Sequence, residues 1–350
     1  MYFSQIIGHK KQVEALKKDI LQRNLAQSYI LSGSNGIGKK MTALLCARYI
    51  NCLSPGEDDA CGFCESCLKF TIVDENGLMK ISTTHPDIEL LQPAWKDENG
   101  KRKKNPLILV DDVRAFQNTI FSKSYIGKYK VGIVDYADMM NEESANSLLK
   151  TLEEPPDNVV IFMVTPLIKK LLPTIRSRCR TIKFYNLPEH EVNSFLTNRG
   201  VSKDKADIIA FVSMGSIGNS LTTDYEEVSS IMDDAINFLH LFFTPRVTER
   251  YVMMERYAKE FDIVRLEKFL WFLQLIISKF IAESWKNEIR EKGFFSEDFF
   301  AVLSRKFSHE VITSLVWMID RIRVDLKYNL NTHLLLDIMN IKFKEILDRG

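Results

Sequence analysis

The sequence predicts an α/β domain built on a mostly parallel sheet, followed by an all-α region. In the first 185 residues, short apolar runs alternate with helical patterns and turn signals, which is typical of β/α units. After about residue 187 the strand-like runs stop. From about residue 233 onward the pattern is helical almost throughout, with apolar residues on repeating faces.

Composition limits the classes of protein that the chain can belong to. A chain of 350 residues suggests two or three domains, and its 45% hydrophobic and 27% charged residues are those of a soluble globular protein. The net charge of +1 gives no electrostatic basis for tight DNA binding by the chain alone. The first residues lack the features of a signal peptide, so we expect a cytoplasmic protein with no membrane contact. The apolar stretch Phe269–Ile277 is too short to span a membrane and predicts a buried helix.

The elements of the α/β domain and the domain boundaries follow from these patterns. The predicted strands are Ser28–Ser32, Leu107–Val110, Lys130–Asp135 and Val159–Thr165. We expect an α/β domain over residues 1–185, a small helical domain over 186–232 and a C-terminal helical domain over 233–350. Gly200 and Gly215 interrupt the helical periodicity of the small domain.

Residues 33–40, GSNGIGKK, follow the first predicted strand and precede a helical stretch. In that context backbone N–H groups and a helix N-terminus face an anion, as in phosphate-binding loops. The residues that fit such a loop are Gly33, Gly36, Gly38 and Lys39. Lys40 stands where the usual loop has a hydroxyl that holds Mg²⁺. Nucleotide binding without hydrolysis and a ligand-free glycine-rich turn therefore both stay open, and Lys40 would bring positive charge to phosphates in place of the metal.

An apolar strand, VGIVD, ends in Asp135, where a phosphate site offers a carboxylate to Mg²⁺. The next residue is usually a Glu that polarises the attacking water, but here it is Tyr136. A phenol is a poor base at neutral pH. Lys40 and Tyr136 thus both predict a loss of hydrolysis. In the alternative, a hydrolytic chain, Thr42 or Asp138 would cover the lost roles.

The cysteine pattern is Cys52-x₈-Cys61-x₂-Cys64-x₂-Cys67, directly after the helix that follows the loop. Tetrahedral Zn²⁺ takes four soft ligands at about 2.3 Å, and two tight C-x₂-C steps with one more distant partner close such a site. In a cytosolic chain the spacing favours metal ligands over disulfides. We predict a structural zinc site, since four thiolates leave no open position for catalysis. Cys46 is expected to be a small buried hydrophobic residue.

The segment TPLIKKLLPTIRSRC (165–179) presents Arg178 after a short helical turn. An Arg at the edge of a nucleotide-binding domain can reach the γ-phosphate held by a neighbouring subunit. Without further evidence, this segment is more simply interpreted as placing Arg178 at the surface or in a salt bridge. His85, in the HPD sequence at 85–87, is expected to have a structural role.

In order, these motifs resemble the clamp-loader branch of the AAA+ ATPases, and within it the delta-prime type of subunit of bacterial DNA polymerase III. The resemblance also includes Ile7-Gly8-His9, and its most specific part is NEESANSLLKTLEEPP followed by LPTIRSRC. It is strong from residue 1 to about 220 and weaker afterwards.

The resemblance implies a P-loop domain with a zinc module at 52–67, a three-helix lid and a C-terminal collar in a hetero-pentamer with gamma/tau-type and delta-type subunits. That complex loads the sliding clamp on primer-template DNA. A delta-prime subunit acts as a stator that hydrolyses no ATP and offers an arginine finger, here Arg178, to the adjacent motor subunit, with Ser177 and Cys179 positioning it. The family lid carries a sensing Arg in Gly-Ser-x-Arg, and Gly218 occupies that place here. The alternative is an ATP-hydrolysing gamma/tau-like motor subunit.

Overall fold

The structure, a computed structural model, describes residues 2–22, 24–75, 78–95, 100–101, 106–242, 246–284, 308–326 and 332–348. Contacts divide the chain into two compact units, Met1–Thr223 and Asp224–Gly350.

The first unit begins with helices and the sheet elements that surround the predicted phosphate loop. Its first half contains η1 (Phe3–Gln5), α1 (Lys10–Leu21), β1 (Ser28–Ser32), α2 (Lys39–Ile50), α3 (Glu65–Leu68), β2 (Phe70–Glu75), β3 (Leu78–Thr83) and β4 (Ile88–Leu91). Its second half contains α4 (Val110–Ile120), β5 (Lys130–Asp135), η2 (Ala137–Met139), α5 (Glu142–Glu153), β6 (Val159–Thr165), η3 (Ile168–Lys170), α6 (Pro173–Arg178) and β7 (Arg180–Lys183).

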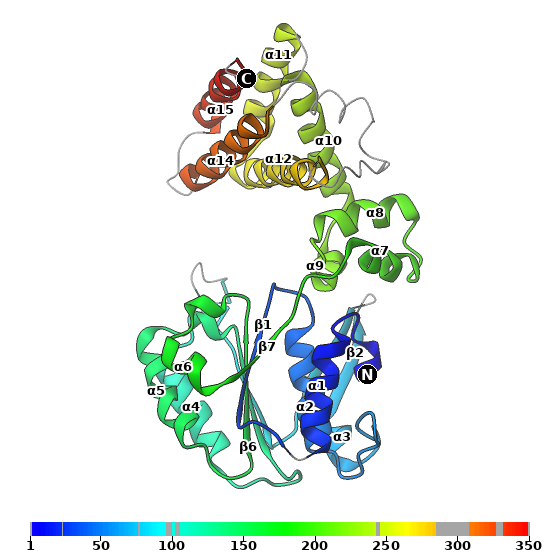
Figure 1. The fold of residues 1–350 in the computed structure, drawn as a ribbon, viewed down its shortest axis with the longest axis vertical. Coiled ribbons are helices and arrows are strands. Elements are labelled where there is room, and N and C mark those ends of the chain that lie inside the picture. The colour runs from blue at the N-terminus through cyan, green and yellow to red at the C-terminus, as the bar shows by residue number, and fades with distance from the viewer. Residues whose placement is uncertain are drawn as a thin grey trace. The chain divides into compact units, whose positions relative to one another are not determined.

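A five-stranded sheet in the order β4-β5-β6-β1-β7 forms the centre of this unit, and every pair in it is parallel. Helices α1 and α2 cover one face, and α4, α5 and α6 cover the other (Figure 1). Side chains alternate along β1: Tyr29 and Leu31 belong to the core beneath α1 and α2, whereas Ile30 belongs to the core beneath α4 and α5. The predicted parallel α/β fold is confirmed.

Three of the four predicted strands are present, as β1, β5 and β6. The prediction of a strand at Leu107–Val110 is wrong: Ile108 makes a single bridge to Met140, and α4 begins at Val110. The Asp112 carboxylate accepts a hydrogen bond from the backbone N–H of Leu109 at 2.9 Å, which caps the helix start. Because of this cap, the chain begins a helix at Val110 and does not continue as a strand.

The small helical region of the first unit consists of α7 (Glu189–Thr197), α8 (Lys203–Val212) and α9 (Ile217–Thr222), as predicted for the lid. Gly215 has φ +77°, and a Cβ there would lie 2.3 Å from the carbonyl oxygen of Leu187. Only glycine fits this turn, which leads the chain directly into α9.

The second unit is helical throughout its described residues, as predicted. Its helices are α10 (Tyr225–Phe242), α11 (Val247–Glu260), α12 (Ile263–Ser284), α14 (His309–Asp325) and α15 (Thr332–Asp348). The predicted boundary at 232/233 falls within α10. The rings of Phe238, Phe269 and Phe343 meet edge to face in the core. Phe269–Ile277 is part of buried helix α12, as expected, and none of the described helices is long and apolar enough to cross a membrane.

Candidate functional site

The predicted phosphate loop leaves the carboxyl end of β1 and enters α2 through Gly38. Gly38 has φ +94°, the left-handed conformation that favours glycine, and a Cβ there would meet no described atom within 4 Å. The amino end of the 12-residue helix α2 therefore faces open space, as an anion site requires.

Lys39 lies inside the loop. Its side chain is buried, and Nζ donates hydrogen bonds to the carbonyl oxygens of Gly33 and Ser34, both at 2.5 Å. Burial lowers the pKa of Lys39 to about 8, although Asp135 and Asp138 act in the opposite direction. The ammonium is thus mostly charged at neutral pH and is held by the loop's own backbone.

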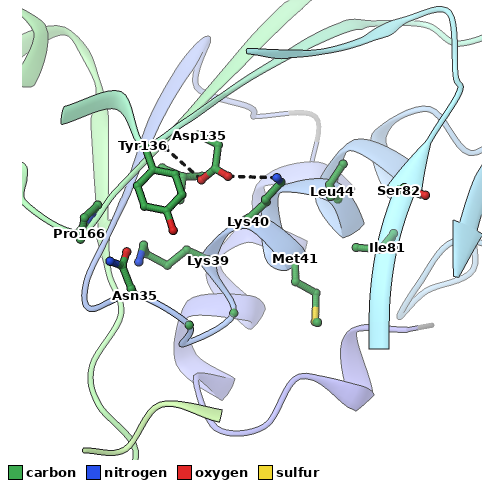
Figure 2. A pocket seen from close by; sticks show the side chains of 13 residues that line it. Asn35, Lys39, Lys40, Met41, Leu44, Ile81, Ser82, Asp135, Tyr136 and Pro166 are labelled. Carbon is green, nitrogen blue, oxygen red and sulfur yellow. Dashed lines mark hydrogen bonds and ion pairs between the residues drawn. The ribbon is translucent and has the colours of Figure 1, made fainter. Parts of the chain in front are cut away.

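Lys40 and Asp135 are brought together by the fold. The Nζ atom of Lys40 lies 3.1 Å from Oδ2 of Asp135 (Figure 2). The same Nζ atom donates a hydrogen bond to Oε1 of Gln92 at 3.1 Å. The other carboxylate oxygen of Asp135 accepts the backbone N–H of Tyr136 at 3.1 Å. The sequence predicted that Lys40 and Asp135 belong to one site. No motif in the sequence identified Gln92 as a further partner of Lys40.

Tyr136 adopts a left-handed backbone conformation with φ +53°, uncommon for a residue other than glycine. Its ring packs edge-on against Trp95 with centroids 5.1 Å apart. Burial, and then the nearby Asp135 and Asp138, raise the pKa of Tyr136, so its phenol is an even weaker base than usual.

The two groups proposed as substitutes for hydrolytic residues are already hydrogen-bonded within the protein. The hydroxyl of Thr42 donates to the carbonyl oxygen of Gly38 at 2.9 Å. Asp138 accepts a hydrogen bond from the hydroxyl of Thr165 at 2.8 Å. Neither geometry favours the hydrolytic alternative.

The start of α9 touches the phosphate loop directly. The backbone N–H of Gly218 donates to the carbonyl oxygen of Gly36 at 2.8 Å, and the Ser216 hydroxyl donates to the carbonyl oxygen of Asn35 at 2.9 Å. A Cβ on Gly218 would lie 2.8 Å from Cα of Gly36, so no side chain fits at 218 in this arrangement. The sequence shows that Gly218 replaces the sensing Arg of the family, but it did not predict the contact between Gly218 and Gly36.

A cavity of about 570 Å³ opens beside the loop, within the range of small-molecule sites (Figure 2). Its wall is formed by Asn35, Gly36, Gly38, Lys39, Lys40, Met41, Leu44, Ile81, Ser82, Asp135, Tyr136, Val164 and Pro166. The predicted site residues Gly36, Gly38, Lys39, Lys40 and Asp135 line this cavity, whereas Gly33 does not.

The four predicted cysteine ligands, Cys52, Cys61, Cys64 and Cys67, converge with all four Sγ atoms within 4.8 Å of one another. Two of the separations are 4.0 Å, between Cys52 and Cys64, and 3.9 Å, between Cys61 and Cys67. Ligands at about 2.3 Å in a tetrahedron lie about 3.8 Å apart, so this geometry fits a tetrahedral ion such as zinc. The backbone N–H of Cys61 also points at the sulfur of Cys52, at 3.2 Å. The four cysteines can therefore hold a metal ion.

His85 connects the cysteine module to the sheet. Its Nε2 lies 2.9 Å from the hydroxyl of Ser66, on α3, and its Nδ1 accepts the backbone N–H of Asp87 at 3.1 Å. Asp87 is buried, with Lys130 Nζ at 3.2 Å and three backbone N–H donors at 2.7 to 2.8 Å. These contacts give His85 the expected structural role.

Arg178 is the last residue of α6. Its guanidinium forms an ion pair with Glu153, at the end of α5, and donates to the carbonyl oxygen of Thr174 at 2.9 Å. The neighbouring Ser177 hydroxyl lies 3.4 Å from the same guanidinium. Cys179 is buried, and burial raises its pKa to about 12. The partner Glu153 was not identified from the sequence.

The sheet register places Arg178 far from the chain's own loop. Arg180 of β7 pairs with Tyr29, so Arg178 lies toward the amino end of β1, whereas the loop follows the carboxyl end at Ser32. At about 3.3 Å per strand residue, the span from Tyr29 to Ser32 alone is about 10 Å, and α6 precedes the Tyr29 end of that span. Arg178 and the loop therefore lie toward opposite ends of β1.

Comparisons with known proteins show which family the chain resembles. A family model described as DNA polymerase III, delta subunit, matches residues 8–188. DNA polymerase III subunit tau/gamma of Haemophilus influenzae is 28% identical over 226 residues, 63% of this chain and 30% of that protein. Subunit gamma/tau of Mycoplasma genitalium is 25% identical over 325 residues, 89% and 48% of the two chains. Subunit delta' of Pseudomonas aeruginosa is 34% identical over 154 residues, 44% and 42% of the two chains.

The chain spans less than half the length of each of these three relatives. The family model, in contrast, covers more than half of the chain, including the phosphate loop, the cysteine cluster and Arg178. The protein therefore belongs to the family described as DNA polymerase III, delta subunit.

Proposed function

We propose that this chain is a non-hydrolytic, delta-prime-type subunit of a cytoplasmic DNA polymerase III clamp loader. In this proposal it joins gamma/tau-type and delta-type subunits in a hetero-pentamer and supplies Arg178 to the ATP site of the neighbouring motor subunit. The complex loads the sliding clamp on primer-template DNA. Residues 1–185 would form the AAA+ domain, α7 to α9 the lid, and the helices from α10 onward the collar, with structural zinc bound by the four cysteines.

The observation that carries the proposal is the position of Arg178 relative to the loop. Arg178 and the loop lie toward opposite ends of β1. A nucleotide bound in the loop of the same chain would therefore lie away from the guanidinium. Contacts in a ring are heterologous, so each subunit presents two different faces to two neighbours. An Arg on one face and a nucleotide loop on the other suit such a ring.

The loop supports the non-hydrolytic part of the proposal. Lys40 pairs with the carboxylate that would hold Mg²⁺, and Tyr136 stands in place of a water-polarising Glu. Gly218 leaves no room for a phosphate-sensing Arg. Nucleotide held without turnover is compatible with the cavity, which is still lined by Gly38 and Lys39.

The second candidate is an ATP-hydrolysing subunit of gamma/tau type, favoured by the names of two of the three relatives described above. It requires a general base and a metal ligand, and the two substitutes in the sequence, Thr42 and Asp138, are engaged elsewhere.

Turnover by the purified, zinc-loaded chain separates the two candidates. The proposal predicts no phosphate release from ATP above that of the Lys39→Ala variant, with or without Mg²⁺. Phosphate release that disappears in Lys39→Ala would establish the motor function instead.

A further inference from the structure

Lys40 occupies the place of a metal ion in this site. In a hydrolytic loop, a hydroxyl at this position and a carboxylate at the end of the neighbouring strand share Mg²⁺. Here the ammonium of Lys40 lies 3.1 Å from Asp135, whose side chain is only 8% exposed. Gln92 accepts a second hydrogen bond from the same ammonium at 3.1 Å, which fixes its position.

The side chains around Asp135 do not fit Mg²⁺. This ion demands near-octahedral oxygen ligands at about 2.0–2.1 Å. The hydroxyl closest in sequence, on Thr42, is committed to the backbone of Gly38, and Asp138 is bonded to Thr165. A fixed ammonium 3.1 Å from Asp135 also repels a second cation at that carboxylate.

The same site keeps what a phosphate group needs. Lys39 and Lys40 both line the cavity, and the amino end of α2 opens into it through Gly38. Two ammonium groups and oriented backbone N–H groups attract an anion without a metal ion. The apolar part of the wall, formed by Met41, Leu44 and Ile81, is suited to less polar parts of a ligand.

We infer that the loop binds the phosphate chain of a nucleoside di- or triphosphate independently of divalent metal, with Lys40 in the role of Mg²⁺. The inference deepens the proposed function, because it concerns nucleotide held by a subunit that does not turn it over. In the bound state, the ammonium of Lys39 exchanges its hydrogen bonds to the carbonyl oxygens of Gly33 and Ser34 for contacts with the phosphates. The ammonium of Lys40 lies between the phosphates and the carboxylate of Asp135.

Binding of ADP to the full zinc-loaded chain, measured by calorimetry with excess Mg²⁺ or with EDTA, tests the inference. We expect dissociation constants that agree within about threefold in the two conditions. Lys40→Ala should weaken binding at least tenfold in both. Lys40→Thr, which restores the hydroxyl, should bind ADP only with Mg²⁺. Lys169→Ala, at an exposed site on η3, is the matched control and should bind like the wild type.

Two outcomes would overturn the inference: wild-type binding at least tenfold tighter with Mg²⁺, or no binding at millimolar ADP in either condition. Phosphate release from ATP is followed in parallel samples of the same protein. Release would contradict the proposed function, whereas metal-dependent binding without release would contradict only the role of Lys40.

Discussion

The backbone N–H of Gly218 donates a hydrogen bond to the carbonyl oxygen of Gly36, 2.8 Å away, and so joins the start of α9 to the phosphate loop by a backbone–backbone contact. In a lid with an Arg at this place, the side chain would have to lie between the two backbones. The observed packing therefore requires that residue 218 has no side chain.

Gly218→Ala should loosen this junction. The added Cβ would lie 2.8 Å from Cα of Gly36, and overpacking of this kind costs about 1–3 kcal/mol of stability. Amide hydrogen exchange in α9 and the loop measures the effect. Gly56→Ala is the control, since its Cβ would meet only the carbonyl oxygen of Asp59 at 3.4 Å. Equal protection of α9 in both variants would show that the contact is not tight.

Replacement of one cysteine ligand should release the metal. Cys64→Ser removes one of the four converging sulfur atoms, and a hydroxyl is a much weaker ligand for zinc than a thiolate. Zinc content of the purified variant should fall from stoichiometric to near zero, with faster hydrogen exchange over residues 52–68. Cys46→Ala, at a buried cysteine outside the cluster, should keep its zinc. Full zinc content in Cys64→Ser would rule out this ligand set.

Asp87→Asn should destabilise the α/β domain. The carboxylate is buried beside Lys130 and accepts three backbone N–H groups, and breaking a buried pair costs about 3–5 kcal/mol. Asp111→Asn, in an exposed pair with Arg114, should cost less than about 1 kcal/mol. Urea unfolding compares the variants, and similar midpoints would contradict the structural role of the HPD motif.

Acid titration checks the same residue by a different route. Burial alone would raise the pKa of Asp87, but the N–H donors and Lys130 lower it below the usual 3.8. The stabilisation is therefore present above that value and is lost as the pH falls through the lower folded pKa. Asp87→Asn should lack this part of the acid dependence of wild-type stability.

Nucleotide affinity should fall as the pH rises through about 8, the pKa to which burial brings Lys39. Above that pH the amine is neutral and no longer attracts a phosphate. Calorimetric titration with ADP over a pH series measures this, and Lys39→Gln should show weak binding without the same pH dependence. A wild-type affinity that does not change across this range would show that Lys39 does not contact the phosphates.

The central strands were predictable from the sequence, whereas the edge strands were not. β1, β5 and β6 are buried on both faces and read as continuous apolar runs. β4 and β7 are short and partly exposed, so neither strand forms a continuous apolar run that could be recognised in the sequence. At the site, local motifs predicted the loop and the cysteine cluster, whereas the role of Arg178 followed only from the family resemblance and stays a prediction. The contacts of Gln92, Glu153 and Gly218 join distant parts of the sequence, and no local pattern encodes them.

Arg178→Ala should leave the fold intact. Its ion pair with Glu153 is one-third to one-half exposed, and such a pair contributes less than about 1 kcal/mol. A loss of activity in this variant therefore reports on the guanidinium and not on stability.

ATP turnover by the complex reconstituted with Arg178→Ala tests the central claim most directly. Arg176→Ala, on the same exposed helix, is the matched control. We predict that Arg178→Ala lowers turnover by up to about 10³-fold, the lower end of arginine-finger effects, while Arg176→Ala stays within a few-fold of the wild type. Turnover by the Arg178→Ala complex equal to that of the Arg176→Ala complex would contradict the claim that this chain acts at its neighbour's ATP site.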